Sequence, residues 1–361
     1  MSNRKDVLGL PTALASIFVF GLLIFGHELG HYVVARLAGV RILEFAMGMG
    51  PKLIGTKRGD TLYTLRLLPL GGYVKMAGMD PEEGEEELAP ASDSGSFMNK
   101  TVLQRMAIIF AGPLMNFLLA LVLFVAVFTY IGVPVESDSN VIGGVMKDKP
   151  AYNAGLQPKD KVVAINGSPT PRWEDLTKTI HASDGKELTI TIERDGEKKD
   201  IKITPKYDAQ SKRYLIGIGA DQVFAKKGTF EAATFGLQRT LDFTKLIITS
   251  IFQMITGKIP ADVGGPVAIV NAIGEGASQG FANLLGLTGM LSIQLGLLNL
   301  FPIPALDGSR LVFLAFEGLR GKPLDPAKEN FIHLVGFALL ILLMIVITYN
   351  DILRLLGAKA G

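Results

Sequence analysis

Four stretches without an Asp, Glu, Lys or Arg residue constrain the fold of this chain more than any other feature. They cover residues 7–26, 106–135, 281–306 and 331–349. Each approaches or exceeds the roughly 20 apolar residues that an α-helix needs to cross a membrane. We therefore expect a polytopic α-helical membrane protein with four transmembrane helices. The helices are expected within residues 1–39, 102–135, 281–308 and 331–356.

The first stretch has an alternative interpretation as a secretory signal, because Asn3, Arg4 and Lys5 precede it. The uncharged run is long for the apolar region of a signal, and no clear small-residue cleavage site follows it. A spanning helix is therefore preferred.

The composition supports this class and limits the chemistry. Of the 361 residues, 48% are hydrophobic and 19% are charged, against about 25% charged in an average soluble protein. The net charge of +2 gives no indication of a nucleic-acid partner. The chain contains no cysteine. A metal site would therefore have to use His, Asp, Glu or backbone ligands.

Two segments outside the spans carry the pattern of β-strands. Residues 40–101 begin with short alternating strands and continue into an acidic loop at 80–95, which we expect to be solvated. Residues 140–222 include "KELTITIERDG" and "KKDIKITPK", which alternate with period two between turn residues. We expect a membrane-associated β-loop in the first segment and one inserted α+β domain in the second.

The segment 229–258 is expected to form an amphipathic helix lying at the membrane interface. Arg239, Asp242 and Lys245 interrupt its apolar face, and the clean apolar part that follows is too short to cross a bilayer.

Positive charges predict the orientation. Lys and Arg are frequent between the first and second spans and recur between the third and fourth. The positive-inside rule places both of these loops in the cytoplasm. The inserted domain at 140–222 and both chain ends are then extracytoplasmic, since long domains cross the membrane regardless of charge.

The stretch "FGHELGHYV" follows directly on the first uncharged run. His27 and His31 are four residues apart, so on a helix both imidazoles lie on one face and can hold one Zn²⁺. Glu28 is placed to take a proton from a zinc-bound water. A helix end with satisfied polar side chains is the alternative, but ionisable groups at membrane depth are usually functional.

Zinc needs a third protein ligand, and Asp307 is the best candidate. His181 belongs to the inserted domain, and His333 begins the fourth span and is expected at the membrane interface. Asp307 ends the third uncharged run on the side of HELGH. Pro302 and Pro304 should break the helix there and turn the aspartate inward. The alternative role for Asp307 is a helix cap.

Several motifs resemble those of the bacterial site-2 proteases, in the same order along the chain. They are "HELGH" in the first span, "LPLGGYVKM" before the second, "AGPLMNF" in the second and "LNLFPIPALDG" in the third. The stretch "PAYNAGLQPKDKVVAINGS" resembles a PDZ domain. The family consists of intramembrane zinc metalloproteases of the regulator-of-sigma-E protease type. Some members carry two PDZ domains in tandem, whereas 140–222 has room for one.

The resemblance implies a role for individual residues. His27, His31 and Asp307 correspond to the zinc ligands, and Glu28 to the general base. The substrate-binding positions that it implies are Asn299 and the β-loop residues Gly71, Gly72, Tyr73 and Val74. Asn299 has an alternative role in a helix–helix hydrogen bond. Pro113 and Asn116 are interpreted as structural.

In the inserted domain, "YLIGIGA" resembles a carboxylate-binding loop. Its peptide-binding residues would be Leu215, Gly217 and Ile218, with an ordinary terminal strand as the alternative. A PDZ fold binds extended peptide ends by strand addition.

The function implied by the resemblance is hydrolysis of peptide bonds within or near transmembrane helices, with Zn²⁺ as cofactor. The expected partners are single-span membrane proteins such as anti-sigma factors, already trimmed outside the membrane, and the lipid bilayer. The expected location is the bacterial cytoplasmic (inner) membrane, with the active site toward the cytoplasm. Two other classes stay open, a membrane-bound PDZ peptide receptor with a structural metal site and a transporter.

Overall fold

The computed structural model describes residues 9–79, 94–136, 139–208, 211, 213–260, 264–322 and 325–355. The chain divides into two compact units, which we describe separately. The first combines Met1–Tyr130 with Gly228–Gly361, and the second is Ile131–Lys227. Most of the expected acidic loop, residues 80–93, lies outside the described residues.

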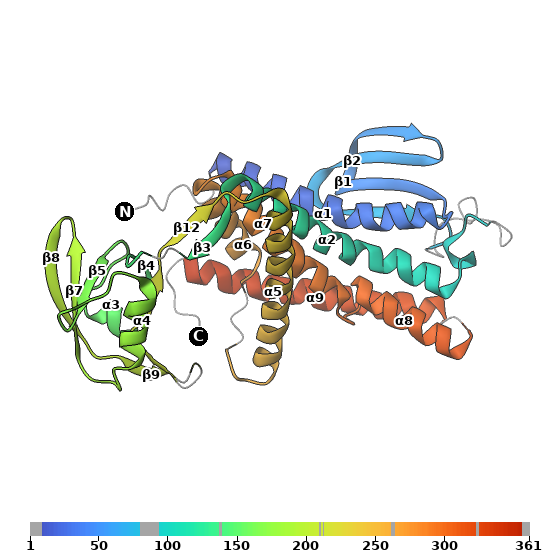
Figure 1. Cartoon of the computed structure of the whole chain (residues 1–361). Coiled ribbons are helices and arrows are strands. Elements are labelled where there is room, and N and C mark those ends of the chain that lie inside the picture. The colour runs from blue at the N-terminus through green and yellow to red at the C-terminus, as the bar shows by residue number, and fades with distance from the viewer. Residues whose placement is uncertain are drawn as a thin grey trace. The chain divides into compact units, whose positions relative to one another are not determined.

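Four helices of the first unit are long and apolar enough to cross a membrane, as predicted (Figure 1). They are α1 (Leu10–Leu37), α2 (Val102–Ile131), α7 (Phe281–Leu300) and α9 (Pro326–Leu355). Large apolar side chains are exposed along all four helices. In the most apolar stretch of 18 residues of α9, only 6% is buried. Such surfaces suit lipid contact rather than water. The chain is therefore a multi-pass membrane protein.

The third span ends earlier than expected. We predicted a helix within residues 281–308, whereas α7 ends at Leu300 and a separate helix, α8 (Asp307–Arg320), follows. The two prolines of the intervening loop explain the break, since neither can donate a backbone hydrogen bond. The short 3₁₀ helix Phe97–Asn99 precedes α2.

A short helix that we did not predict, α6 (Pro266–Ser278), packs against α1, α7 and α9. With 13 residues it is too short to span a bilayer. Asp351 of α9 is buried and accepts hydrogen bonds from the N–H groups of Gly265 and Ala268 at the start of α6. This cap satisfies donors that a helix N-terminus otherwise leaves without partners.

The predicted amphipathic helix is present as α5 (Thr229–Ile255) and packs against α2. Phe243 stacks on Phe124 at 6.0 Å, and Phe235 meets Phe128 edge to face at 5.7 Å between ring centroids. Its position at the membrane interface stays a prediction.

The strands β1 (Ile42–Arg58) and β2 (Thr61–Met76) form a long hairpin that folds back on itself. Residues 44–47 of β1 pair with 62–65 of β2 on one side and with 72–75 on the other. Within the described part of the chain, the end of β2 therefore has a partner strand along one edge only. We call residues 72–76 the edge segment.

Glu44 ties the strands of this hairpin together. Its carboxylate accepts hydrogen bonds from Thr64, Arg66 and Tyr73, the last of which belongs to the edge segment. Burial alone would raise the pKa of Glu44, but these hydrogen bonds outweigh it and hold that pKa below its ordinary value. Burial and the bond to Glu44 raise the pKa of Tyr73 to about 12, so its phenol keeps its proton at neutral pH.

The second unit is the expected inserted α+β domain. One sheet has the order β6-β5-β7-β8, and three further strand pairs are β3 with β12, β4 with β11 and β9 with β10. The strands are β3 (Val133–Glu136), β4 (Ile142–Val145), β5 (Lys161–Ile165), β6 (Ser168–Pro169), β7 (Leu188–Arg194), β8 (Glu197–Ile203), β9 (Lys206–Asp208), β10 (Arg213–Leu215), β11 (Ile218–Ala220) and β12 (Gln222–Ala225). Its helices are α3 (Pro150–Asn153) and α4 (Trp173–His181). Leu176 of α4 is fully buried in the apolar core of this unit.

Candidate active site

The two histidines of HELGH lie one turn apart on α1 and face the same point. Their Nε2 atoms are 3.2 Å apart, and the side chains of His27 and His31 are 12% and 9% exposed. The i, i+4 spacing that the sequence shows is therefore realised on a continuous helix.

Helix α2 packs closely behind these histidines. A Cβ atom at Gly112 would lie 2.9 Å from Cε1 of His27 and even closer to the His31 ring, so only glycine leaves room for both. The next residue, Pro113, has no N–H to offer the carbonyl of Ile109 and opens this turn of the helix. The carbonyl of Ile108 lies 2.9 Å from Nδ1 of His31.

Asp307 reaches the histidines because the chain breaks between α7 and α8. It is the first residue of α8, and Leu306 precedes it as the N-cap. The first turn of α8 packs onto the end of α7, where any Cβ at Gly308 would overlap the carbonyls of Leu300 and Phe301. The LDG sequence thus combines a candidate ligand with the glycine that this close approach requires.

A buried ion pair holds α8 against α2. The guanidinium of Arg105 donates to both carboxylate oxygens of Glu317, and the two side chains are 6% and 14% exposed. Leu314 of α8 is buried in the same apolar cluster as Ile108 and Ile109 of α2. The helix that begins with Asp307 is therefore fixed along its length.

The three side chains have the spacing of a metal site. Oδ2 of Asp307 lies 3.1 Å from Nε2 of His27 and 3.4 Å from Nε2 of His31. Tetrahedral zinc with ligands at about 2.0–2.2 Å requires ligand atoms roughly 3.3 Å apart. Oδ2 is buried and accepts no well-aligned hydrogen bond, as expected of an oxygen aimed at an ion between the ligands. Among the described residues, these three form the group able to hold a metal.

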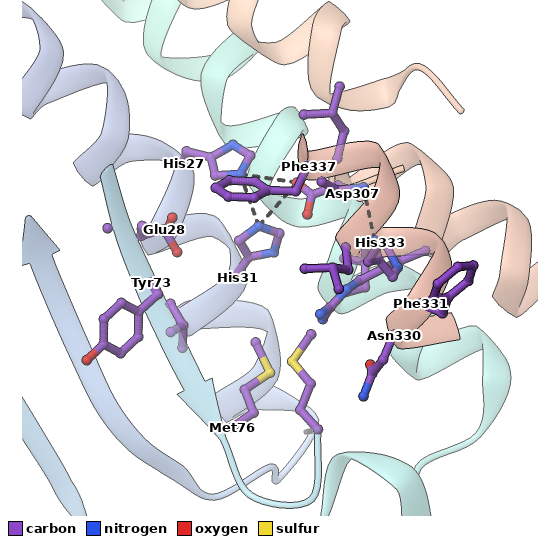
Figure 2. Close-up of a pocket in the computed structure, with 18 of the residues that line it drawn as sticks. His27, Glu28, His31, Tyr73, Met76, Asp307, Asn330, Phe331, His333 and Phe337 are labelled. Atoms are coloured by element: carbon purple, nitrogen blue, oxygen red, sulfur yellow. Dashed lines mark hydrogen bonds and ion pairs between the residues drawn. The ribbon is translucent and has the colours of Figure 1, made fainter. Parts of the chain in front are cut away.

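Glu28 and the edge segment lie beside this cluster (Figure 2). His27, His31, Glu28 and Asp307 line one cavity of about 830 Å³ together with Gly72, Tyr73 and Val74. A Cβ built on Gly72 would lie 3.1 Å from Cγ of Glu28. The end of β2 therefore runs directly past the carboxylate proposed as general base.

Other residues singled out in the sequence lie elsewhere. Asn299 is half-buried on α7 and does not line this cavity, and neither does Gly71. Leu215, Gly217 and Ile218 belong to the second unit, where the Gly217 carbonyl accepts a hydrogen bond from the N–H of Met146. Their roles in binding stay predictions.

His333, expected at the membrane interface, lines the same cavity, and its depth in the membrane stays a prediction. Its Nδ1 accepts a 3.0 Å hydrogen bond from the N–H of Ala305, two residues before Asp307 (Figure 2). Ala305 has φ +74°, a left-handed conformation that is strained for a residue with a side chain. His333 thus supports the strained loop that positions Asp307. This contact could not be predicted from the sequence, because the two residues lie on separate segments.

We expect His333→Ala to lower cleavage while zinc stays bound. One hydrogen bond has a net value of about 0.5–1.5 kcal/mol, which corresponds to a decrease of about two- to twelvefold. Asn330→Ala, on the same helix and the same cavity wall, is the matched control. Cleavage rates and zinc content of both purified variants test the role. Equal rates in the two variants would show that the Ala305 contact does not matter.

The comparison with known families decides the class. The model for peptidase family M50 matches residues 15–343. The chain belongs to peptidase family M50. The M50 membership confirms the protease family indicated by the motifs, and with it the prediction of a zinc metalloprotease.

Similar M50 proteins cover nearly the whole chain. Zinc metalloprotease RasP of Oceanobacillus iheyensis is 36% identical over 96% of this chain and 100% of the relative. A putative zinc metalloprotease of Clostridium acetobutylicum is 38% identical, covering 93% of this chain and 96% of the relative. The regulator of sigma-W protease RasP of Bacillus subtilis is 34% identical, covering 95% and 99%.

A solved structure is similar to part of the chain. It is the crystal structure of the PDZ domain of an SdrC-like protein from Listeria monocytogenes, with 22% identity and a TM-score of 0.21. The matched region covers 24% of this chain and 93% of the chain in that structure.

Proposed function

We propose that this M50 protease cleaves membrane proteins within or near their transmembrane helices. His27, His31 and Asp307 hold the zinc ion, and Glu28 is the general base. The observation that carries the proposal is the convergence of three ligand atoms, 3.1–3.4 Å apart, beside a carboxylate and an open strand edge in a membrane-spanning unit.

Each residue has a defined task in this reaction. Zinc bound by the three ligands supplies the Lewis acidity that activates a water molecule and polarises the scissile carbonyl. Glu28 accepts the proton of the attacking water and returns it to the leaving amine. Asp307 is held beside the two histidines by the loop that contains Pro302 and Pro304 and by the contact of that loop with His333.

The edge segment offers a binding mode for the substrate. An extended peptide that pairs with residues 72–76 would satisfy backbone groups that a membrane interior leaves without partners. Because Gly72 lies against Glu28, the paired backbone would run past the base. A substrate helix must unwind locally to bind in this way.

The name of one relative supports a substrate class. The Bacillus subtilis relative is named a regulator of sigma-W protease, which supports single-span anti-sigma factors as substrates. In this proposal an extracytoplasmic cleavage comes first. The PDZ-type domain then lies outside the cytoplasm, and the metal site lies toward the cytoplasmic side of the membrane. This orientation agrees with the distribution of Lys and Arg.

Cleavage of a single-span reporter by the full chain in lipid vesicles tests the proposal. Zinc-loaded protein is expected to cut the reporter near its membrane segment, and removal of zinc by a chelator is expected to stop the reaction until zinc returns. A membrane-bound peptide receptor with a structural metal would bind the reporter and zinc without cutting. That result would contradict the proposal.

The edge segment makes a separate prediction. Val74→Pro removes a backbone N–H and fixes φ, so we expect strand addition and cleavage to fall while zinc content is unchanged. Val74→Ala keeps the N–H group and serves as the control for lost packing. Reporter cleavage and metal content are measured for both. Parent-like cleavage by Val74→Pro would exclude substrate docking at this edge.

A further inference from the structure

Both candidate zinc-binding histidines turn their second ring nitrogen toward α2. Nδ1 of His31 lies 2.9 Å from the carbonyl oxygen of Ile108, and Nδ1 of His27 lies 3.1 Å from the amide nitrogen of Asn116. The Nε2 atoms face Asp307. Helix α2 therefore contacts each ring at the atom opposite the one that would bind the metal.

This arrangement constrains the tautomer of each ring. A neutral imidazole that gives its Nε2 lone pair to a metal carries its proton on Nδ1 and needs an acceptor there. The Ile108 carbonyl can only accept, so it selects this tautomer for His31. His27 faces a carboxamide, which can present either a donor or an acceptor.

Asn116 has an unused acceptor at this place. The residue is fully buried, and its Oδ1 atom has no hydrogen-bond partner. Its amide nitrogen lies 3.1 Å from Nδ1 of His27, which fits a His27 ring that carries its proton on Nε2. Rotation of the carboxamide by a half-turn brings Oδ1 to Nδ1 and fits the other tautomer.

We propose that Asn116 is a positioning residue for the metal site. Its NH₂ group can donate to Nδ1 of His27 when the ring carries its proton on Nε2. When a zinc ion takes Nε2, the proton resides on Nδ1 and the rotated carboxamide accepts from it through Oδ1. The side chain orients His27 in both states and touches neither metal nor substrate. This role rests on the proposed ligation of zinc by His27.

The choice of asparagine follows from these two states. Leucine has a similar volume and offers neither donor nor acceptor. Aspartate only accepts, so it favours the tautomer that binds metal. Outer partners of metal-binding histidines typically change metal affinity by about 10–100-fold when removed.

Zinc affinity of the full chain in detergent, measured by competition with a chelator, tests the proposal. We expect Asn116→Leu to weaken zinc binding by about 10–100-fold and Asn116→Asp to restore it to the parent level or above. Ser292→Ala is the control, because the Ser292 hydroxyl donates to the backbone carbonyl of Asn116 and is equally buried. It should bind zinc as the parent does.

The outcomes separate this inference from the proposed function. Parent-like zinc affinity in Asn116→Leu would overturn the positioning role while leaving the zinc site intact. Equal losses in Asn116→Leu and Asn116→Asp, or in Asn116→Leu and Ser292→Ala, would also overturn it, since they would indicate a packing effect. A parent chain that binds no zinc would overturn the zinc site itself, and the positioning role with it.

Discussion

Glu28→Gln is expected to abolish cleavage while zinc stays bound. Glutamine preserves the size of the side chain and leaves His27, His31 and Asp307 in place, but it cannot accept a proton from the attacking water. General acid–base catalysis typically contributes about 10²–10⁴-fold to the rate, so the decrease should be of at least this order. Reporter cleavage and metal content of the purified variant, measured side by side, give the answer.

The control for this experiment is Glu275→Gln, an exposed carboxylate on α6 that does not line the cavity. It should cleave at the parent rate. Substantial cleavage by Glu28→Gln would remove Glu28 from the role of base. Loss of zinc in the same variant would instead place Glu28 among the ligands.

Asp307→Asn is expected to reduce both zinc affinity and cleavage. A neutral amide is a poor replacement for the carboxylate oxygen that lies 3.1 Å and 3.4 Å from the two imidazole nitrogens. Loss of a direct ligand should exceed the roughly 100-fold upper range for outer partners. Chelator competition measures the affinity, and reporter cleavage measures the consequence for catalysis.

Asp351→Asn separates this effect from the general loss of a buried carboxylate. Asp351 is 4% exposed and caps α6, remote in sequence from every proposed ligand. This variant should lose stability, because a neutral amide lacks the attraction between a carboxylate and the positive N-terminal end of α6, yet it should keep its zinc. If Asp307→Asn binds zinc as tightly as the parent, Asp307 is a helix cap and another group completes the site.

The sequence predicted the spans and the cluster of His27, His31 and Asp307 because both depend on local signals. A run of about 20 apolar residues without charges is long enough for a spanning helix. HELGH places two imidazoles on one face of the helix wherever that helix forms. Asp307 was found through its own neighbours, Pro302 and Pro304, which mark the break in the helix.

Contacts between distant segments could not be predicted in the same way. Asn116 was interpreted as structural because a single amide in an apolar helix does not identify its partner, and His27 lies 89 positions away. The contact between His333 and Ala305 was missed for the same reason. The helix α6 was missed because its 13 residues fall below spanning length and contain two glycines, Gly274 and Gly276.

The side chains around the proposed zinc position also balance its charge. Two neutral imidazoles contribute none, while the carboxylates of Glu28 and Asp307 contribute two negative charges, which one divalent cation neutralises. In the apolar surroundings of a membrane-spanning unit, the attraction between these carboxylates and a divalent cation is weakly screened. A monovalent ion in the same position would leave one negative charge unbalanced, so the charge of the side chains favours a divalent ion.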